Sequence, residues 1–202
     1  MNRLIVVFTT LFILTLFYKT AQAEEGHHAL GFQAGHVGLS GDVGSRYGNA
    51  LGWGVFADYA ASDWLDFELG YLNSKHTNNS LSMTQNALSA SILYNVDQFD
   101  LFIPYLRGGA EFVSANEDIV NPSNLVPSGY STTAFGLDVG FGGKFLIGTN
   151  FMAGADFTYH SMFDSNVSLP NGTNAKAIQS YLTVMLRLGF VFGAEKKEGK
   201  TF

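Results

Sequence analysis

From Ala29 onward, apolar and polar side chains alternate along most of the chain. Between residues 51 and 59 the odd positions carry Leu, Trp, Val, Ala and Tyr, while two glycines and Asp58 stand at even positions. A period of two indicates β-strands rather than helices. Eight segments show this period, and they span residues 29–39, 51–59, 65–71, 87–94, 106–112, 135–142, 151–160 and 182–192.

The first of these segments changes parity part-way along its length. Its apolar residues stand at even positions over 30–34, whereas Val37 and Leu39 stand at odd positions. One extra residue in a strand produces such a change. We therefore expect a β-bulge near Gly35 or Gly38.

The segments and their connections have the dimensions of membrane-crossing strands. Together with the residues that flank the alternating stretches, the segments run about ten to fourteen residues, more than the five or six usual in soluble sheets. A tilted strand needs ~9–11 residues to cross a bilayer. Long loops at one rim and short turns at the other are typical of bacterial outer-membrane barrels. The pattern predicts an all-β fold, one eight-stranded antiparallel up-and-down transmembrane β-barrel. The longer connections are 41–49, 77–82, 115–130 and 164–176, and the tight turns are 61–63, 96–100 and 148–150.

The chemistry of the two faces indicates which one points inward. A soluble eight-stranded barrel turns its apolar face to the interior, whereas a membrane barrel turns that face to lipid. Here the opposite face carries charges and many of the 23 glycines, which cannot fill an apolar core. We therefore expect the apolar face to lie outside. The alternative is a soluble barrel or sandwich that turns its apolar face inward. The aromatic residues expected at the membrane interfaces are Trp53, Tyr59, Tyr71, Phe135, Phe151, Tyr159 and Phe192.

The inward parity collects most of the ionisable residues of the strands, namely Asp58, Glu68, Arg107, Glu111, Asp138, Asp156, His160 and Arg187. Charges in a narrow interior must be paired. Counted from the tight turns, Asp156 and Arg187 have similar depth, and so do Arg107, Glu111 and Asp138. We predict carboxylate–guanidinium pairs at both places. They form either a structural plug or a gate on a narrow water path, since eight strands enclose little more than side chains.

The composition narrows the classes further. The chain has 202 residues, no cysteine and a formal net charge of −6. The missing cysteine excludes disulfides, thiolate metal ligands and a cysteine nucleophile, and the acidic balance argues against nucleic-acid binding.

The N-terminus has the features of a secretory signal peptide over residues 1–23. Arg3 precedes about fifteen mostly apolar residues, fewer than the ~20 of a membrane-spanning helix, and small residues stand at 21–23 for cleavage. An uncleaved membrane anchor is the alternative. We expect the barrel over residues 24–193 and a short polar tail over 194–202.

Three stretches of the chain carry a family resemblance. Residues 62–71 (SDWLDFELGY), 104–110 (PYLRGGA) and 186–192 (LRLGFVF) resemble the turn, strand opening and closing strand of small outer-membrane β-barrel proteins of the OmpA/OmpX type. The resemblance implies an outer-membrane location and contact with outer-membrane lipids and lipopolysaccharide. It also implies assembly by the barrel-assembly machinery, which would read Gly189, Phe190 and Phe192. In many members the chain ends at the last barrel Phe, whereas here it continues to Phe202.

Candidate catalytic and metal-binding residues are few. His160 and Ser161 form an enzyme-like pair, but adjacent strand residues point to opposite faces and cannot readily share a hydrogen bond. His27 and His28 could touch a metal, but no converging carboxylates accompany them. We expect no catalysis, no cofactor and no metal, with a lipid-modifying enzyme as the least favoured alternative.

The long loops are where a partner would bind. Residues 115–130 combine prolines, acids and apolar residues, whereas 164–176 is polar and rich in Asn. We expect a monomeric outer-membrane protein with a structural or interaction role, acting through membrane integrity and surface contacts of loops 115–130 and 164–176. A narrow gated channel for ions or small solutes is the alternative.

Overall fold

The computed structural model describes residues 28–78, 81–96, 102–119, 131–148, 150–163, 166–168, 174–176 and 178–193. The predicted signal peptide over 1–23 and the predicted tail over 194–202 lie outside these residues, as do His27 and most of the loop over 115–130.

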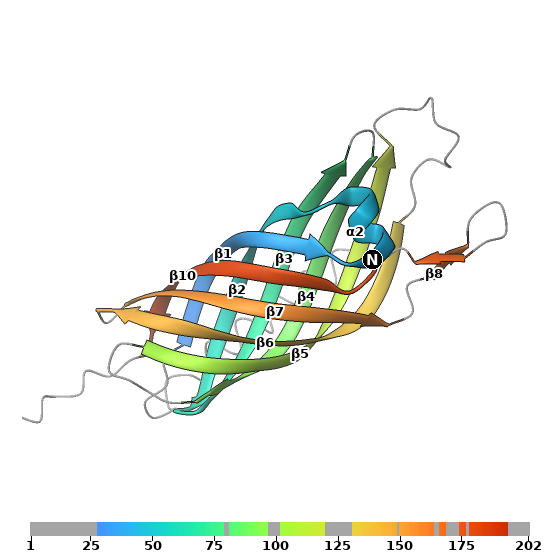
Figure 1. Ribbon diagram of the computed structural model, residues 1–202. Coiled ribbons are helices and arrows are strands. Elements are labelled where there is room, and N and C mark those ends of the chain that lie inside the picture. The colour runs from blue at the N-terminus through green and yellow to red at the C-terminus, as the bar shows by residue number, and fades with distance from the viewer. Residues whose placement is uncertain are drawn as a thin grey trace, which may run out of the picture.

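Eight antiparallel strands close into a barrel (Figure 1). Each strand pairs with the barrel strands before and after it in the chain, and β1 closes the barrel against the last one, with His28 opposite Phe192. The predicted eight-stranded up-and-down barrel is therefore confirmed. The strands are β1 (His28–Leu39), β2 (Ala50–Ser62), β3 (Leu65–Asn78), β4 (Leu81–Asn95), β5 (Phe102–Ile119), β6 (Ser131–Ile147), β7 (Phe151–Phe163) and β10 (Tyr181–Phe192).

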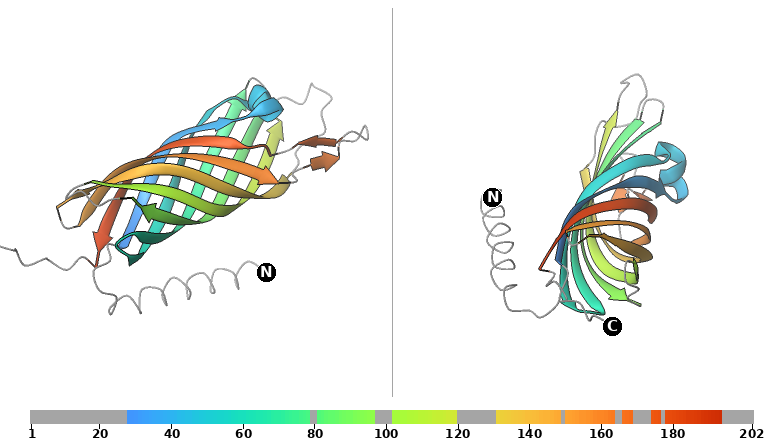
Figure 2. Two further views of the ribbon diagram at one scale, coloured as in Figure 1. Left: turned by 60° about the horizontal axis from the view of Figure 1, so that its bottom comes forward. Right: turned by 90° about the vertical axis from the view of Figure 1, so that its left-hand side faces the viewer.

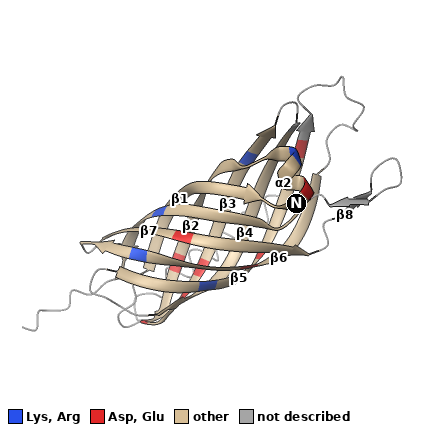
Figure 3. Ribbon diagram, in the orientation of Figure 1, with Lys and Arg blue, Asp and Glu red and all other residues tan. Residues whose placement is uncertain are grey.

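The barrel wall has an apolar outer face. Exposure alternates along the strands because successive side chains point to opposite sides. The exposed positions carry large apolar side chains on every strand, for example Leu30, Phe67, Leu88, Phe141 and Leu186. Figure 3 shows acidic and basic positions close together on neighbouring strands in the half of the barrel away from α2 (Gly41–Tyr47). The glycine-rich, charged face is thus the inner one.

One side of the barrel is taller than the other. Strands β3 to β6 have 14, 15, 18 and 17 residues, against 12 or 13 for β1, β2, β7 and β10. The taller side rises at the end that carries α2 and a short hairpin of β8 (Asn166–Ser168) and β9 (Asn174–Lys176) (Figures 1 and 2). We call this the long-loop end. The tight turns, the start of β1 at His28 and the end of β10 at Phe192 lie at the opposite end, the short-turn end.

The expected bulge in β1 is absent from the described strand. Its pairing with β10 runs without interruption from His28 to Leu39, and its pairing with β2 is equally regular. The register shift of the described barrel lies instead between Ala60 and Ser62 of β2. Val37 points inward and lies in the apolar cluster inside the barrel. The apolar residues change parity because the interior is apolar at this height, and the strand itself stays regular.

The connection between β1 and β2 forms the helix α2, where the sequence predicts a loop. Val43 and Tyr47 are its buried residues, and both belong to the apolar cluster inside the barrel. Gly41, the first residue of the helix, and Gly48, which follows its last residue, have φ of 61° and 70°, a left-handed conformation that glycine adopts without strain. Within the described residues, no helix has the length and apolarity required to cross a membrane.

Candidate functional site in the barrel interior

Arg187 lies at the centre of a buried charge cluster. Its side chain is fully enclosed, with a relative exposure of 1% for the residue. The guanidinium donates to the Glu68 carboxylate and lies 3.5 Å from Asp58 Oδ1. It also lies 3.3 Å from Asp156 Oδ2 and 2.9 Å from the Tyr105 hydroxyl. The structure thus brings together the predicted pair Arg187–Asp156, with Glu68 and Asp58 as further partners.

Glu68 connects Arg187 to a second guanidinium. Its Oε1 accepts a hydrogen bond of 2.5 Å from Arg107 Nη1, while its Oε2 accepts from Arg187. Arg107 Nε donates to Asp138 Oδ1 at 2.9 Å, and the Ser91 hydroxyl also lies against the Asp138 carboxylate. Each guanidinium therefore shares its charge between carboxylates from different strands, which the rigid fork of Arg permits.

Two members of the cluster are missing from the predicted set. Lys144 donates to Asp66 Oδ2 at 2.7 Å and to Asp58 Oδ2 at 3.2 Å. Both Lys144 and Asp66 continue the inward parity of residues already assigned, two positions beyond Gly142 and two before Glu68. The alternation could have revealed them if the segments had been followed to their ends.

The cluster contains more acids than bases. Three cations, Arg107, Lys144 and Arg187, face five carboxylates, and all eight groups are buried. Such groups are stable inside a protein only while their partners remain, because an uncompensated buried charge is costly. This arrangement ties β2, β3, β5, β6, β7 and β10 together across the interior. The carboxylates are Asp58, Asp66, Glu68, Asp138 and Asp156.

Glu111 belongs to a different group from the one predicted. Its carboxylate lies 3.0 Å from His160 Nδ1 and accepts a 2.7 Å hydrogen bond from the Tyr181 hydroxyl. None of the described ion pairs joins it to Arg107. The reason is depth: Glu111 pairs with Gly136 on β6, four residues nearer the long-loop end than the partner of Arg107.

His160 does not act with Ser161. Ser161 pairs with the outward-facing Leu137, whereas His160 is buried inside and its Nε2 lies 3.1 Å from the Thr183 hydroxyl. Glu111, His160 and Thr183 therefore form a chain of carboxylate, imidazole and hydroxyl, the order found in nucleophilic catalysis. Thr183 is buried and lines a cavity of about 20 Å³. That volume holds a water or two and no acyl substrate.

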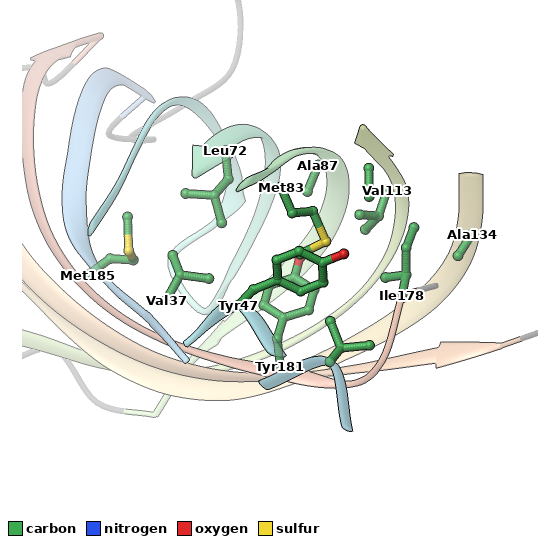
Figure 4. Packing of buried hydrophobic residues seen from close by; sticks show 12 residues of the cluster. Val37, Tyr47, Leu72, Met83, Ala87, Val113, Ala134, Ile178, Tyr181 and Met185 are labelled. Atoms are coloured by element: carbon green, nitrogen blue, oxygen red, sulfur yellow. The ribbon is translucent and has the colours of Figure 1, made fainter. Parts of the chain in front are cut away.

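Apolar clusters close the interior on both sides of the charges. Toward the short-turn end, Phe56 packs with Met152 and Val191, and the Arg187 guanidinium lies 3.9 Å from the Phe56 ring centroid. Toward the long-loop end, Tyr47 of α2 packs beside Met83 and Tyr181 (Figure 4). The described interior is therefore filled at three levels, apolar, charged and apolar.

The other predicted residues lie on the wall. Trp53, Phe135, Phe151 and Tyr159 are exposed on its outer face, and Tyr59, Tyr71 and Phe192 are half-buried there. Of the expected assembly signal, Phe190 points outward and packs edge-on against Phe151, with ring centroids 5.6 Å apart. A side chain added at Gly189 would meet Met152 and Phe56 in the interior. The roles of these residues at the membrane interfaces and in assembly stay predictions.

His28 is occupied by structural contacts. Its Nδ1 accepts a 3.1 Å hydrogen bond from the Ala60 amide, and its ring stacks on Tyr59 with centroids 4.9 Å apart. Among the described residues, no three His, Cys, Asp or Glu side chains converge as metal ligands.

The family model for the outer membrane protein beta-barrel domain matches residues 8–187, most of the chain. The chain belongs to this outer-membrane β-barrel family. The family and the closed barrel together place the protein in the outer membrane. In such barrels the short turns face the periplasm, so the long-loop end is extracellular.

Solved structures of small outer-membrane barrels have the same fold. Neisserial surface protein A is 20% identical with a TM-score of 0.61, covering 84% of this chain and 99% of that one. OprG from Pseudomonas aeruginosa is 13% identical with a TM-score of 0.60, covering 83% and 96%. Ail, the attachment invasion locus protein of Yersinia pestis, is 16% identical with a TM-score of 0.52, covering 83% and 99%. No curated protein sequence matches the chain.

Proposed function

We propose that the protein is a closed, monomeric barrel that contributes to outer-membrane integrity and presents its extracellular side to a partner. The observation that supports this role is the filled interior, with a buried charge cluster between two apolar clusters. A solute path needs continuous water, whereas the mid-barrel cavity has only about 20 Å³. In this proposal, contacts with the membrane and with a partner are made by the outer surface and the loops.

The tall side of the barrel supports an interaction role. Strands β3 to β6 extend farthest toward the extracellular side, and the loop over 115–130 joins β5 and β6. The hairpin of β8 and β9 lies within the second proposed contact region, 164–176. A protein of the same fold is named for attachment and invasion, which is in line with surface contact as the proposed role.

The experiment compares attachment and conductance in the same variants. Replacing residues 120–130 by a short Gly-Ser linker should reduce attachment of cells carrying the protein to partner surfaces. Replacing the short turn over 97–100 in the same way is the matched control and should leave attachment unchanged. Both variants must retain the migration shift of a folded barrel on unboiled gels. Equal attachment by the two variants would contradict the proposal.

A narrow gated channel is the second candidate, because the cavity touches Arg107 and Asp156 of the charge cluster. In planar bilayers the closed-barrel role predicts no conductance above background for the wild-type protein. Discrete conductance that rises when Arg187 is replaced by Ala would favour the channel instead.

A further inference from the structure

The outer wall of β1 to β4 changes character in three successive rows toward the extracellular end. Strand register places the residues of the first two rows opposite one another on all four strands, and in the third row it pairs His36 with Leu51 and Lys75 with Thr84. Leu51 and Lys75 each adjoin the last paired residues of β2 and β3, Gly52 and Ser74. The first row is apolar or aromatic, the second adds amides, and the third carries two basic residues. From β1 to β4 the rows are Phe32–Val55–Tyr71–Leu88, Ala34–Trp53–Asn73–Asn86 and His36–Leu51–Lys75–Thr84.

The second row combines an open aromatic ring with amide groups that have spare hydrogen-bonding capacity. Asn86 Oδ1 accepts from Asn73 Nδ2 at 2.8 Å and from the Tyr71 hydroxyl at 2.7 Å. These bonds fix the two amides, and within the described residues Asn86 Nδ2 and Asn73 Oδ1 have no partner. Trp53 is 47% exposed beside them, with its ring 6.0 Å from that of Tyr71. The row therefore offers a flat apolar surface next to a free donor and a free acceptor.

The third row adds positive charge without a counter-charge. Lys75 and His36 are exposed on the outer face, on either side of Leu51, the most exposed apolar residue of the described wall at 82%. Lys75 takes part in none of the described ion pairs, which involve other cations. No outward position of the described β1 to β4 holds a carboxylate. An anionic group arriving at this row would meet no repulsion from the wall.

The neighbouring wall lacks this combination. Continuing the second and third rows onto β5 and β6 gives Ser114 and Thr133, and then Asn116 and Ser131. These positions carry no cation and no exposed indole. The combination of all three features is therefore absent from the same rows of β5 and β6.

We propose that this surface, the residues of the three rows on β1 to β4, binds the phosphorylated sugar headgroup of an outer-leaflet glycolipid, the lipid A part of lipopolysaccharide. The order of the rows matches the order of groups in such a lipid: acyl chains, then sugar, then phosphate. The Trp53 ring packs on a sugar face, the two amides bond its hydroxyl and amide groups, and Lys75 donates to the phosphate. The site is independent of the loops, so it stands or falls separately from the proposed surface contacts.

The two tryptophans of the chain allow a direct test. Trp64 lies in the turn between β2 and β3 at the opposite end of the barrel, so W64F leaves Trp53 as the sole reporter. The W64F protein in neutral detergent is titrated with bisphosphorylated lipid A, and the Trp53 emission is expected to shift and saturate. K75Q in the same background should weaken binding about tenfold, the ratio for losing one hydrogen bond to a charged group. K75R, which keeps the positive charge, should retain most of the affinity for lipid A.

Matched controls separate the headgroup from other causes. K176Q removes one cation from β9, outside the three rows, and should bind lipid A as the W64F protein does. Dephosphorylated lipid A should bind about tenfold more weakly than the bisphosphorylated form, and inorganic phosphate should leave the Trp53 emission unchanged. The proposal is overturned if K75Q and K176Q bind equally, if dephosphorylated lipid A binds as tightly, if phosphate alone reproduces the shift, or if no saturable change occurs.

Discussion

Arg187 contacts three carboxylates and a tyrosine hydroxyl from four other strands, so one side chain connects much of the barrel interior. Its Nε has no partner among the described residues, yet both terminal nitrogens are bonded. The alternation of the sequence predicts that this residue points inward. Its choice of partners depends on the tilt and register of strands that are distant in the chain, which is why Glu68 was not predicted as its partner.

Replacing Arg187 by Ala should destabilise the folded barrel strongly. The substitution leaves the carboxylates of Glu68, Asp58 and Asp156 without that cation, and breaking a buried ion pair from one side costs about 3–5 kcal/mol. The measurement is the urea midpoint of unfolding in detergent, read from the gel shift of unboiled protein.

Arg46→Ala is the control for this substitution. Arg46 is partly exposed and lies 3.9 Å from Glu117, a geometry worth at most about 1 kcal/mol. Equal losses of stability in the two variants would show that the interior charges are not the cause.

Two wall glycines differ in the space that a methyl group would find. A Cβ at Gly35 would collide with the Val184 carbonyl oxygen and lie 2.8 Å from the Met185 Cα, whereas a Cβ at Gly108 meets nothing within 4 Å. Gly35→Ala should therefore cost about 1–3 kcal/mol of unfolding free energy, as overpacking does, and Gly108→Ala should be close to neutral. Urea titrations of both variants under the same conditions test this, and equal midpoints would contradict it.

At the scale of elements, α2 shows what alternation does not reveal. The segment over 41–47 has no apolar run, and its helix is too short to be stable alone. It is held by the packing of Val43 and Tyr47 inside the barrel, by the Tyr47 hydroxyl on Glu117, and by the Asn78 side chain, which donates to the Arg46 carbonyl at 3.0 Å. These contacts require the assembled rim, so the sequence predicted only a loop here.

Replacing Tyr47 by Ala should release α2 from the mouth of the barrel. The loss of the ring should lower the unfolding free energy by about 3–5 kcal/mol, and hydrogen exchange of the α2 amides should become faster. Tyr47→Phe keeps the packing and removes only the hydroxyl, so its loss should be smaller, about 1–3 kcal/mol. Unchanged exchange in the Ala variant would mean that other contacts hold the helix.

At the scale of the whole molecule, the expected processing and insertion can be tested together. If residues 1–23 are a signal peptide, the mass of the protein extracted from outer membranes should correspond to a chain that begins at Glu24. The same protein should migrate differently with and without boiling, because a barrel that stays folded in detergent is compact. A chain that retains residues 1–23 would indicate the membrane anchor instead.

The alternation in the sequence was sufficient to predict the number of strands, the antiparallel order and the lipid-facing side, because strand geometry links each side chain's face to its position in the chain. The glycines and charges on the face opposite the aromatic residues indicated that the interior is polar. The alternation predicted the pairs Arg187–Asp156 and Arg107–Asp138, which the structure brings together. It did not reveal that Glu68 bonds both guanidinium groups, that Glu111 bonds His160, or that α2 and two apolar clusters close the barrel. Those features depend on distances between strands that are far apart in sequence, and only the closure and tilt of the barrel set such distances.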